Sequence, residues 1–271
     1  QLSMKPNVWQ APLAGPRPQY RRKARLAIDA RNPNQIKLGF REANSSNVIN
    51  VETCPILVDP LSKLIGPLRD ALTGFESARH IGHISLIAGD NTSHLVIKHT
   101  KALEAELIDA VSELMNTSSS VGVCGIELKL ENKQGQIRSV GRGTDMVMNT
   151  VNGCSISPSA NDFIQINKVV NEKMVNQAIG WLNPKPNERI ADWFSGLGNF
   201  TLPIAKLGAK VQAVEGVAEM VRRAKDNAQQ QGIENVEWLH LDLADKTNVE
   251  ASLQLGFDKV LLDPSREGAL T

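Results

Sequence analysis

A short glycine loop between a strand and a helix constrains the fold of this chain most. Residues 192–200, DWFSGLGNF, follow an apolar run and open a helical pattern. A strand that ends in Gly-x-Gly and passes into a helix lets the backbone approach a ligand closely. Thr201 stands where the dinucleotide fingerprint has its third glycine, so the loop departs from that fingerprint. The sequence predicts a ligand loop, and a turn that uses glycine for geometry alone is the alternative.

The charge around this loop indicates the kind of ligand. Asp192 lies four residues before the first glycine, and residues 192–200 contain no Lys or Arg. A carboxylate here would repel a pyrophosphate and attract a cation. An amino group together with a sulfonium is the charge pattern of S-adenosylmethionine, which we therefore expect as the ligand.

Three further strands are expected after the loop, and each ends in an acid. The strands and their acids are residues 210–214 with Glu215, 236–241 with Asp242, and 258–262 with Asp263. Each acid alone could be a helix cap, but acids at successive carboxyl ends of a parallel sheet line its ligand crevice. Glu215 lies 23 residues after Asp192, close to the spacing of about 20 at which an acid meets a ribose diol. We predict a Rossmann-like sheet with Glu215 as the ribose ligand.

The preceding part of the chain has the pattern of a separate α+β unit. Expected strands lie at residues 20–28, 36–41, 48–52, 84–88, 95–99 and 121–127, and expected helices at 59–75 and 102–115. These elements predict a mixed sheet with helices against one face. A helix at residues 168–182 precedes the first Rossmann strand. We therefore expect an α+β domain over residues 1–157 and the N-terminal part of an α/β domain over residues 158–271.

A basic cluster occupies the first strand of the α+β unit. Residues 1–50 contain nine Lys/Arg against two Asp/Glu, whereas the remaining residues contain 21 against 27. This asymmetry suggests a polyanionic substrate and a cationic cofactor. The predicted hairpin could lay its basic side chains along an RNA backbone, with Tyr20 available for stacking, and a solvated strand face is the alternative. The candidate RNA-binding residues are Arg21, Arg22, Lys23, Arg25 and Arg41.

Cysteine usage and hydropathy indicate the compartment. Cys54, Cys124 and Cys154 lie far apart in a chain with no signal peptide and no apolar run long enough to cross a membrane. We expect a cytoplasmic protein without membrane association, whose thiols are reduced or metal-bound. The chain begins with Gln1 and stops just past the fourth Rossmann strand, so we expect a piece of a longer, monomeric protein.

Seven motifs together resemble the RNA uracil-C5-methyltransferases, and within them the subfamily that acts on 23S ribosomal RNA. They are YRRKAR at residues 20–25, GFR at 39–41, CPIL at 54–57, DFIQIN at 162–167, DWFSGLGNF at 192–200, VEG at 214–216 and LLDPSR at 261–266. DFIQIN joined to DWFSGLGNF is the specific combination, because other methyltransferases share only the second motif. The resemblance implies a Rossmann-like class I methyltransferase domain behind an α+β RNA-facing domain. It also implies methyl transfer from S-adenosylmethionine to C5 of a uracil in 23S ribosomal RNA.

The resemblance further assigns ligand roles to individual residues. Its methyl-donor ligands fall on Gln165, Phe194, Asn199, Glu215, Asp242 and Asp263. Asp242 matches a position that is Asn in some relatives, which keeps a hydrogen-bond acceptor. Cys54 falls on the last of four cysteines that hold a 4Fe-4S cluster, and the other three would lie before Gln1. We therefore expect the cluster in the intact protein and not in this chain.

The family's chemistry adds a cysteine thiolate to C6 of the uracil, so that C5 takes the methyl group before a general base removes the C5 proton. The resemblance places both groups beyond Thr271, so we expect no catalytic residue and no activity in this chain alone. The target base has to be unpaired or flipped. Two alternatives stay open: a transfer RNA uracil-C5-methyltransferase, against which Cys54-Pro55 argues, and an RNA-binding scaffold that has lost catalysis.

Overall fold

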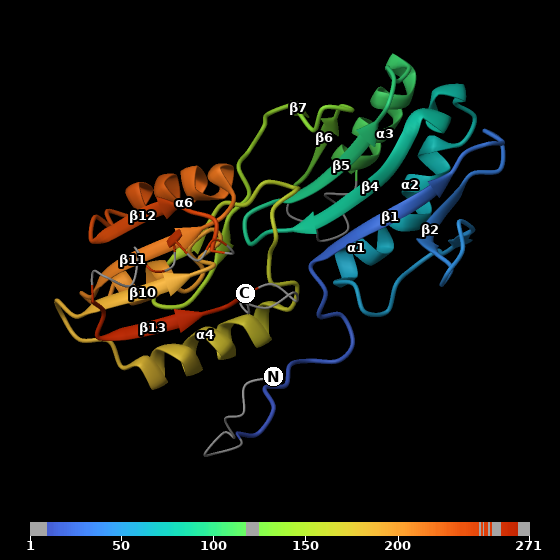
Figure 1. The fold of residues 1–271 in the computed structure, drawn as a ribbon. Helices are drawn as coiled ribbons and strands as arrows, with labels where there is room; N and C mark the ends of the chain where they lie inside the picture. Colours follow the sequence, from blue (N-terminus) through green and yellow to red (C-terminus); the bar gives the residue numbers. More distant parts are fainter. Residues whose placement is uncertain are drawn as a thin grey trace.

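Two main sheets organise the chain in the computed structural model (Figure 1). The structure describes residues 10–117, 125–243, 245, 247, 248, 250 and 256–264. The two sheets lie side by side, each with its own apolar core. No helix in these described ranges is both long enough and apolar enough to span a membrane.

The first sheet has seven strands in the order β3-β2-β1-β4-β5-β6-β7. Their bounds are β1 Lys23–Asp29, β2 Lys37–Arg41, β3 Val48–Asn50, β4 Ile81–Ala88, β5 Ser93–His99, β6 Ile126–Glu131 and β7 Ile137–Val140. Only β5 and β6 pair in parallel, so the sheet is mixed, as the sequence predicts. The predicted hairpin of β1 and β2 is confirmed, with Ala27 opposite Gly39. Of the strand expected at 121–127, residues 121–124 lie outside the described part.

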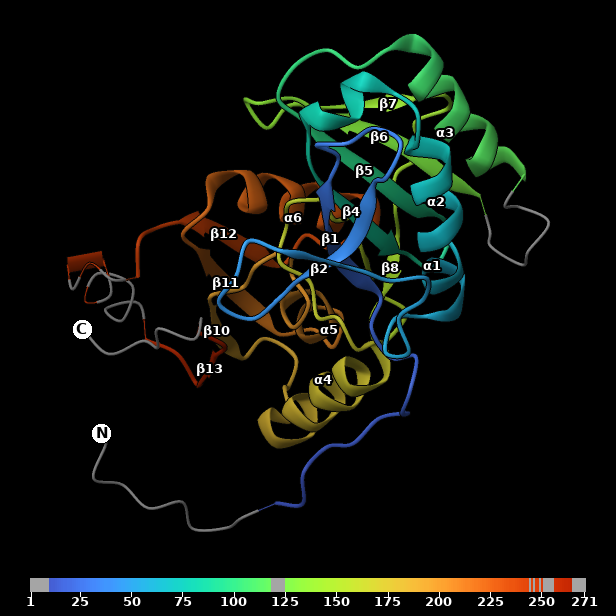
Figure 2. The ribbon, with the colours of Figure 1, turned by 90° about the vertical axis from the view of Figure 1, so that its right-hand side faces the viewer.

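Helices cover one face of this sheet (Figures 1 and 2). They are α1 Asp59–Lys63, α2 Ile65–Leu72, the 3-10 turn η1 Glu76–His80 and α3 Ala105–Thr117. Leu68 of α2 and Leu86 of β4 are fully buried in the shared core, and each such burial stabilises by about 2–3 kcal/mol. The single helix expected at 59–75 is divided at Leu64. Pro67 has no N–H to donate to the carbonyl four residues earlier, which weakens the helix at this point.

The second sheet is parallel throughout, in the order β12-β11-β10-β13. Its strands are β10 Arg189–Trp193, β11 Lys210–Glu215, β12 Val236–His240 and β13 Lys259–Leu262, and its helices are α4 Lys168–Leu182, α5 Thr201–Ala205 and α6 Ala218–Gln230. In Figure 1, α6 lies on one side of the sheet and α4 on the other. This order, with the first strand inside and helices on both faces, is that of the Rossmann-like fold, which confirms the predicted fold class.

Local signals fix the bounds of α4 where the sequence predicts them. The side chain of Asn167 accepts a hydrogen bond from the backbone N–H of Val170 and caps the helix, a contact that contributes about 1 kcal/mol. The helix ends at Asn183, whose φ of 41° is left-handed. Val175, on the inner face of α4, is buried in the same core as Ile190 of β10.

A small hairpin joins the two parts of the chain. Its strands are β8 Met148–Asn149 and β9 Ser155–Ile156. Met148 and Ile156 belong to the second core, which also takes up Ile87 and Val96 from the first sheet. The second core therefore packs against the face of the first sheet that the helices leave open. A domain division between residues 157 and 158 stays a proposal.

Candidate functional site

The loop after β10 turns sharply at the carboxyl end of the sheet. Phe194 has a φ of 65°, which is uncommon for a bulky residue and persists only where the surrounding structure holds the backbone in place, as it often does at functional sites. Gly198 follows with a φ of 94°, and a Cβ built there would lie 3.0 Å from Leu202 Cγ and 3.2 Å from Trp238. The left-handed conformation therefore favours glycine, and a side chain here would also displace Leu202 or Trp238 slightly. The helix that follows, α5, is a single short turn.

Glu215, at the end of β11, holds this loop. Its carboxylate accepts hydrogen bonds from the backbone N–H of Gly196 and of Val217, each at 3.0 Å. The backbone N–H of Ser195 donates to the carbonyl of Val214 at 3.0 Å. A carboxylate has about four lone-pair sites, so Glu215 retains acceptor capacity towards a ligand.

Residues from separate segments meet in a pocket beside the loop. Four of the six predicted donor ligands line it: Gln165, Phe194, Asn199 and Asp263. Its enclosed volume of about 60 Å³ holds only part of a nucleoside-sized ligand, so the remainder has to lie along the neighbouring strand ends. Glu215 lies on that path because it contacts Gly196 of the pocket wall. Asp242 is exposed after β12 and does not line the pocket.

Asn171 is a pocket residue that the motifs missed. It lies on α4, is 4% exposed, and exchanges two side-chain hydrogen bonds with Asn199, at 2.9 and 3.0 Å. This pair fixes the Asn199 amide in the pocket wall. The available signal was a polar residue four positions before Val175, on the apolar face of the helix.

Asp192 lies under the loop and is fully buried. Its Oδ2 accepts a hydrogen bond from the Thr201 hydroxyl at 2.5 Å, and Oδ1 has no partner among the described residues. Burial raises the pKa of Asp192 to about 7; the charges of Asp263 and Glu215 also raise it, and the Thr201 hydrogen bond lowers it. Asp192 therefore links β10 to α5 and does not line the pocket, and its attraction of a cationic ligand stays a prediction.

The basic residues in and around the β1–β2 hairpin differ in exposure. Arg22 is 6% exposed, and its Nε donates to the carbonyl of Gln165 at 3.0 Å. Lys23 donates from Nζ to the carbonyls of Ala160 and Asp162, each at 2.8 Å. These two side chains fasten the start of β1 to the segment before α4, so they do not lie on an open strand face, and their contact with RNA stays a prediction.

The remaining basic candidates are more accessible. Arg25 and Arg41 are exposed, and Arg41 donates to the carbonyl of Ser46 at 3.1 Å. Arg21 is half-buried and donates from Nε to the carbonyl of Lys23 at 3.0 Å. A surface for RNA on this hairpin therefore rests mainly on Arg25 and Arg41.

Cys54 and Cys154 are buried free thiols. The Ser62 hydroxyl accepts a hydrogen bond from the backbone N–H of Cys54 at 2.8 Å and donates one to the backbone carbonyl of Cys54 at 3.0 Å. Burial raises the pKa of the Cys154 thiol. No group of three or more His, Cys, Asp or Glu in the described ranges could hold a metal ion. The residues around Cys54 therefore do not fit an iron–sulfur cluster by themselves.

A solved structure has a similar fold. The tRNA (uracil-54, C5)-methyltransferase of Pyrococcus abyssi, in complex with S-adenosyl-L-homocysteine, superposes with a TM-score of 0.66 over 93% of this chain and 61% of that one. The two sequences are 18% identical, so this likeness concerns the fold alone.

Sequence comparison places the chain in a family. The 23S rRNA (uracil(1939)-C(5))-methyltransferase RlmD of Alteromonas mediterranea is 76% identical over 271 residues, covering 100% of this chain and 55% of that protein. The protein of the same name from Klebsiella pneumoniae is 38% identical over 251 residues, or 92% of this chain and 56% of that protein. The chain thus spans about half the length of these curated relatives. The sequence model of the tRNA (uracil-5-)-methyltransferase family matches residues 6–254, and the chain belongs to that family.

Proposed function

We propose that the full protein transfers a methyl group from S-adenosylmethionine to C5 of a uracil in 23S ribosomal RNA. The observation that carries this proposal is the convergence of Gln165, Asn199 and Asp263 on one pocket at the strand ends. Support also comes from the family and from the names of the relatives, which are 23S rRNA methyltransferases.

The pocket and its rim offer the groups that such a donor needs. Glu215 would accept hydrogen bonds from the ribose hydroxyls, because it ends the second strand beside the glycine loop. Gln165 and Asn199 offer amide groups to the polar part of the donor, and Phe194 offers an apolar face. Asp263 and Glu215 favour a cationic ligand by charge. Asp242, at the same edge of the sheet, stays a predicted ligand.

The bound donor would supply a methyl group activated by a sulfonium. Uracil C5 becomes nucleophilic enough when a thiolate adds to C6; C5 then takes the methyl, a base removes the C5 proton and the thiolate leaves. Cys54 and Cys154 are 8% and 1% exposed, so neither suits this attack, and Cys124 lies outside the described residues. We propose that another part of the full protein supplies the thiolate and the base.

The proposed function also bears on the cellular location and the oligomeric state of the full protein. A ribosomal RNA substrate favours a cytoplasmic location, and a pocket built within one chain favours a monomer. Cys54 as a ligand of a 4Fe-4S cluster stays a prediction, and no step of the reaction is derived from a cluster.

A methyl-transfer assay tests the proposed function. The full protein is incubated with labelled S-adenosylmethionine and with unmodified 23S ribosomal RNA or transfer RNA, and the modified nucleosides are separated. We expect 5-methyluridine in the ribosomal RNA, and no transfer by residues 1–271 alone. Label in transfer RNA only would favour the transfer RNA enzyme, and RNA binding without transfer would favour the scaffold.

The exposed arginines of the hairpin allow a second test. Arg25→Gln combined with Arg41→Gln should weaken binding of all RNAs and flatten the log–log salt dependence by about 0.7 for each lost phosphate contact to a single strand. Arg31→Gln is the matched control: it removes an arginine of the same hairpin whose side chain is 87% exposed and paired with Asp29. A double variant with the salt slope of the Arg31 control would show that Arg25 and Arg41 form a solvated face.

A further inference from the structure

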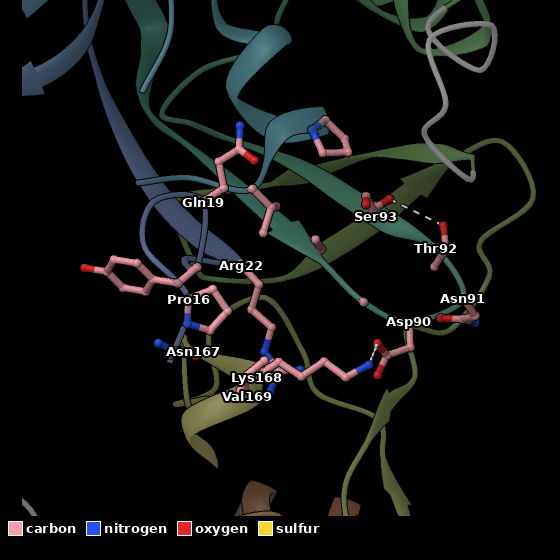
Figure 3. Close-up of a pocket in the computed structure, with 15 residues that line it drawn as sticks. Pro16, Gln19, Arg22, Asp90, Asn91, Thr92, Ser93, Asn167, Lys168 and Val169 are labelled. Atoms are coloured by element: carbon pink, nitrogen blue, oxygen red, sulfur yellow. Dashed lines mark hydrogen bonds and ion pairs between the residues drawn. The ribbon is translucent and has the colours of Figure 1, made fainter. Parts of the chain in front are cut away.

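A second cavity lies at the start of α4 (Figure 3). Its volume is about 370 Å³. Four segments form its walls: the N-terminal segment with Pro16 and Gln19, the start of α1 with Val58 and Pro60, the turn between β4 and β5, and residues 167–169. Arg22 lines both this cavity and the donor pocket, so the two sites share a wall.

Arg22 brings an unsatisfied cationic donor to that wall. Its Nη1 is buried and has no hydrogen-bond partner within the described part of the chain. The nearby acids do not supply one: Asp90 accepts from Lys168 Nζ at 2.5 Å and from the N–H of Asn149 at 2.6 Å, and Glu172 acts on Arg22 only through its charge. A buried guanidinium donor without an acceptor is costly, so the site favours a ligand that provides one.

The first turn of α4 adds a backbone donor. Asn167 caps the N–H of Val170, whereas the N–H of Val169 has no acceptor among the residues that the structure describes. Val169 lines the cavity. The N-terminus of a 15-residue helix carries a partial positive charge, and its N–H groups bind phosphate and other anions.

Contacts on several sides hold the cavity in shape. Lys173 Nζ donates to the carbonyl of Ala14 at 2.7 Å, and a Cβ on Gly15 would lie 2.9 Å from Val170 Cγ2, so the N-terminal segment packs closely on α4. On the opposite side, the backbone N–H of Asp90 donates to the carbonyl of Val147 at 2.7 Å. An anion entering this cavity would meet donors that are already in position, which lowers the cost of binding.

We propose that this cavity binds a phosphodiester of the RNA substrate, held between the Arg22 guanidinium and the N–H of Val169 in the first turn of α4. This inference rests on the proposed function and adds a phosphate site next to the methyl-donor pocket. The Nε of Arg22 holds the carbonyl of Gln165. The same side chain therefore connects the bound strand to a predicted donor ligand, which places the strand beside the reacting groups.

Val169 offers a test that leaves the buried arginine intact. It is 36% exposed, lines the cavity, and lies in the first turn of α4, where aspartate is favourable for the helix. In the full protein, Val169→Asp places a carboxylate in the anion site and should weaken binding of unmodified ribosomal RNA about tenfold or more. The matched control, Val169→Asn, has nearly the same shape without the charge and should stay within about twofold of wild type.

A phosphate scan locates the contact on the RNA. Single methylphosphonate linkages, which are uncharged, are introduced around the target uracil, and affinities are measured for wild type and for Val169→Asp. Wild type should lose affinity at one linkage, and the variant should show little further loss there. Equal affinities of Val169→Asp and Val169→Asn, or no linkage with this coupling, would overturn the proposal.

Titration with S-adenosylhomocysteine separates the RNA phosphate from the other available anion, the carboxylate of the donor. Both Val169 variants should bind S-adenosylhomocysteine within about twofold of wild type. Loss of this affinity in Val169→Asp, with RNA binding retained, would assign the cavity to the donor and contradict the inference. Coupling at one linkage in a protein that transfers no methyl group would remove the proposed function and leave the phosphate site in place.

Discussion

Replacing Asp192 with asparagine should stabilise the protein progressively more, relative to wild type, between about pH 4 and pH 8. The pKa of this acid is 3.8 in the absence of the fold and about 7 in the native state. Between these values the unfolded chain has released the proton that the native state keeps, so the free energy of unfolding of wild type falls as pH rises and levels off above about pH 7. Asparagine does not titrate, so the stability difference between the two proteins should grow by roughly 4 kcal/mol over this range.

Urea unfolding of both proteins across this pH range measures the difference. Thr201→Val serves as a second variant, because it removes the hydroxyl that donates to Asp192 and lowers its pKa. In that variant the fall in stability should extend to higher pH. A difference between Asp192→Asn and wild type that does not change with pH would show that Asp192 is ionised in the native state across the range.

Glu215→Gln should weaken S-adenosylmethionine and S-adenosylhomocysteine alike, because both carry the ribose. The carboxylate can accept from ribose hydroxyls while it accepts from Gly196 and Val217, whereas the amide of glutamine has one acceptor atom. Loss of a charge-assisted hydrogen bond costs about 1.5–3 kcal/mol, or roughly 10- to 150-fold in affinity. Calorimetric titration of both ligands measures this loss.

Glu237→Gln is the matched control for this substitution. Glu237 lies on the next strand, β12, and accepts from Gln212 at 3.1 Å without lining the donor pocket. Its variant should keep both affinities within about twofold of wild type. Affinities as close to wild type for Glu215→Gln would exclude the acid of β11 as a ribose ligand.

Local signals explain why much of the fold was predictable. The helix at residues 168–182 begins and ends at asparagines that cap it, and its predicted bounds are confirmed. The parallel strands after it were recognisable because each is a short apolar run next to a turn. The helix is divided at Leu64 because of a proline. A proline in a sequence indicates that a helix is interrupted, but it does not indicate at which residue.

The parts of the site that the sequence did not predict depend on long-range contacts. Arg22 bonds to Gln165, 143 residues away in sequence, and this contact turns an apparent surface arginine into a buried one. Asn171 and Asn199 meet only because α4 packs beside the loop after β10. The burial of Asp192 follows from its inner position in the sheet, between β11 and β13. The spacing of residues within one segment of the sequence does not indicate such long-range contacts.

A crystal structure of the full protein with S-adenosylhomocysteine would test the central claim most directly. We expect the ligand at the carboxyl ends of β10, β11 and β13, with its ribose hydroxyls donating to Glu215 and its remaining polar groups in contact with Gln165 and Asn199. A ligand bound away from these residues, or a protein that does not bind it, would contradict the assignment of this pocket to the methyl donor.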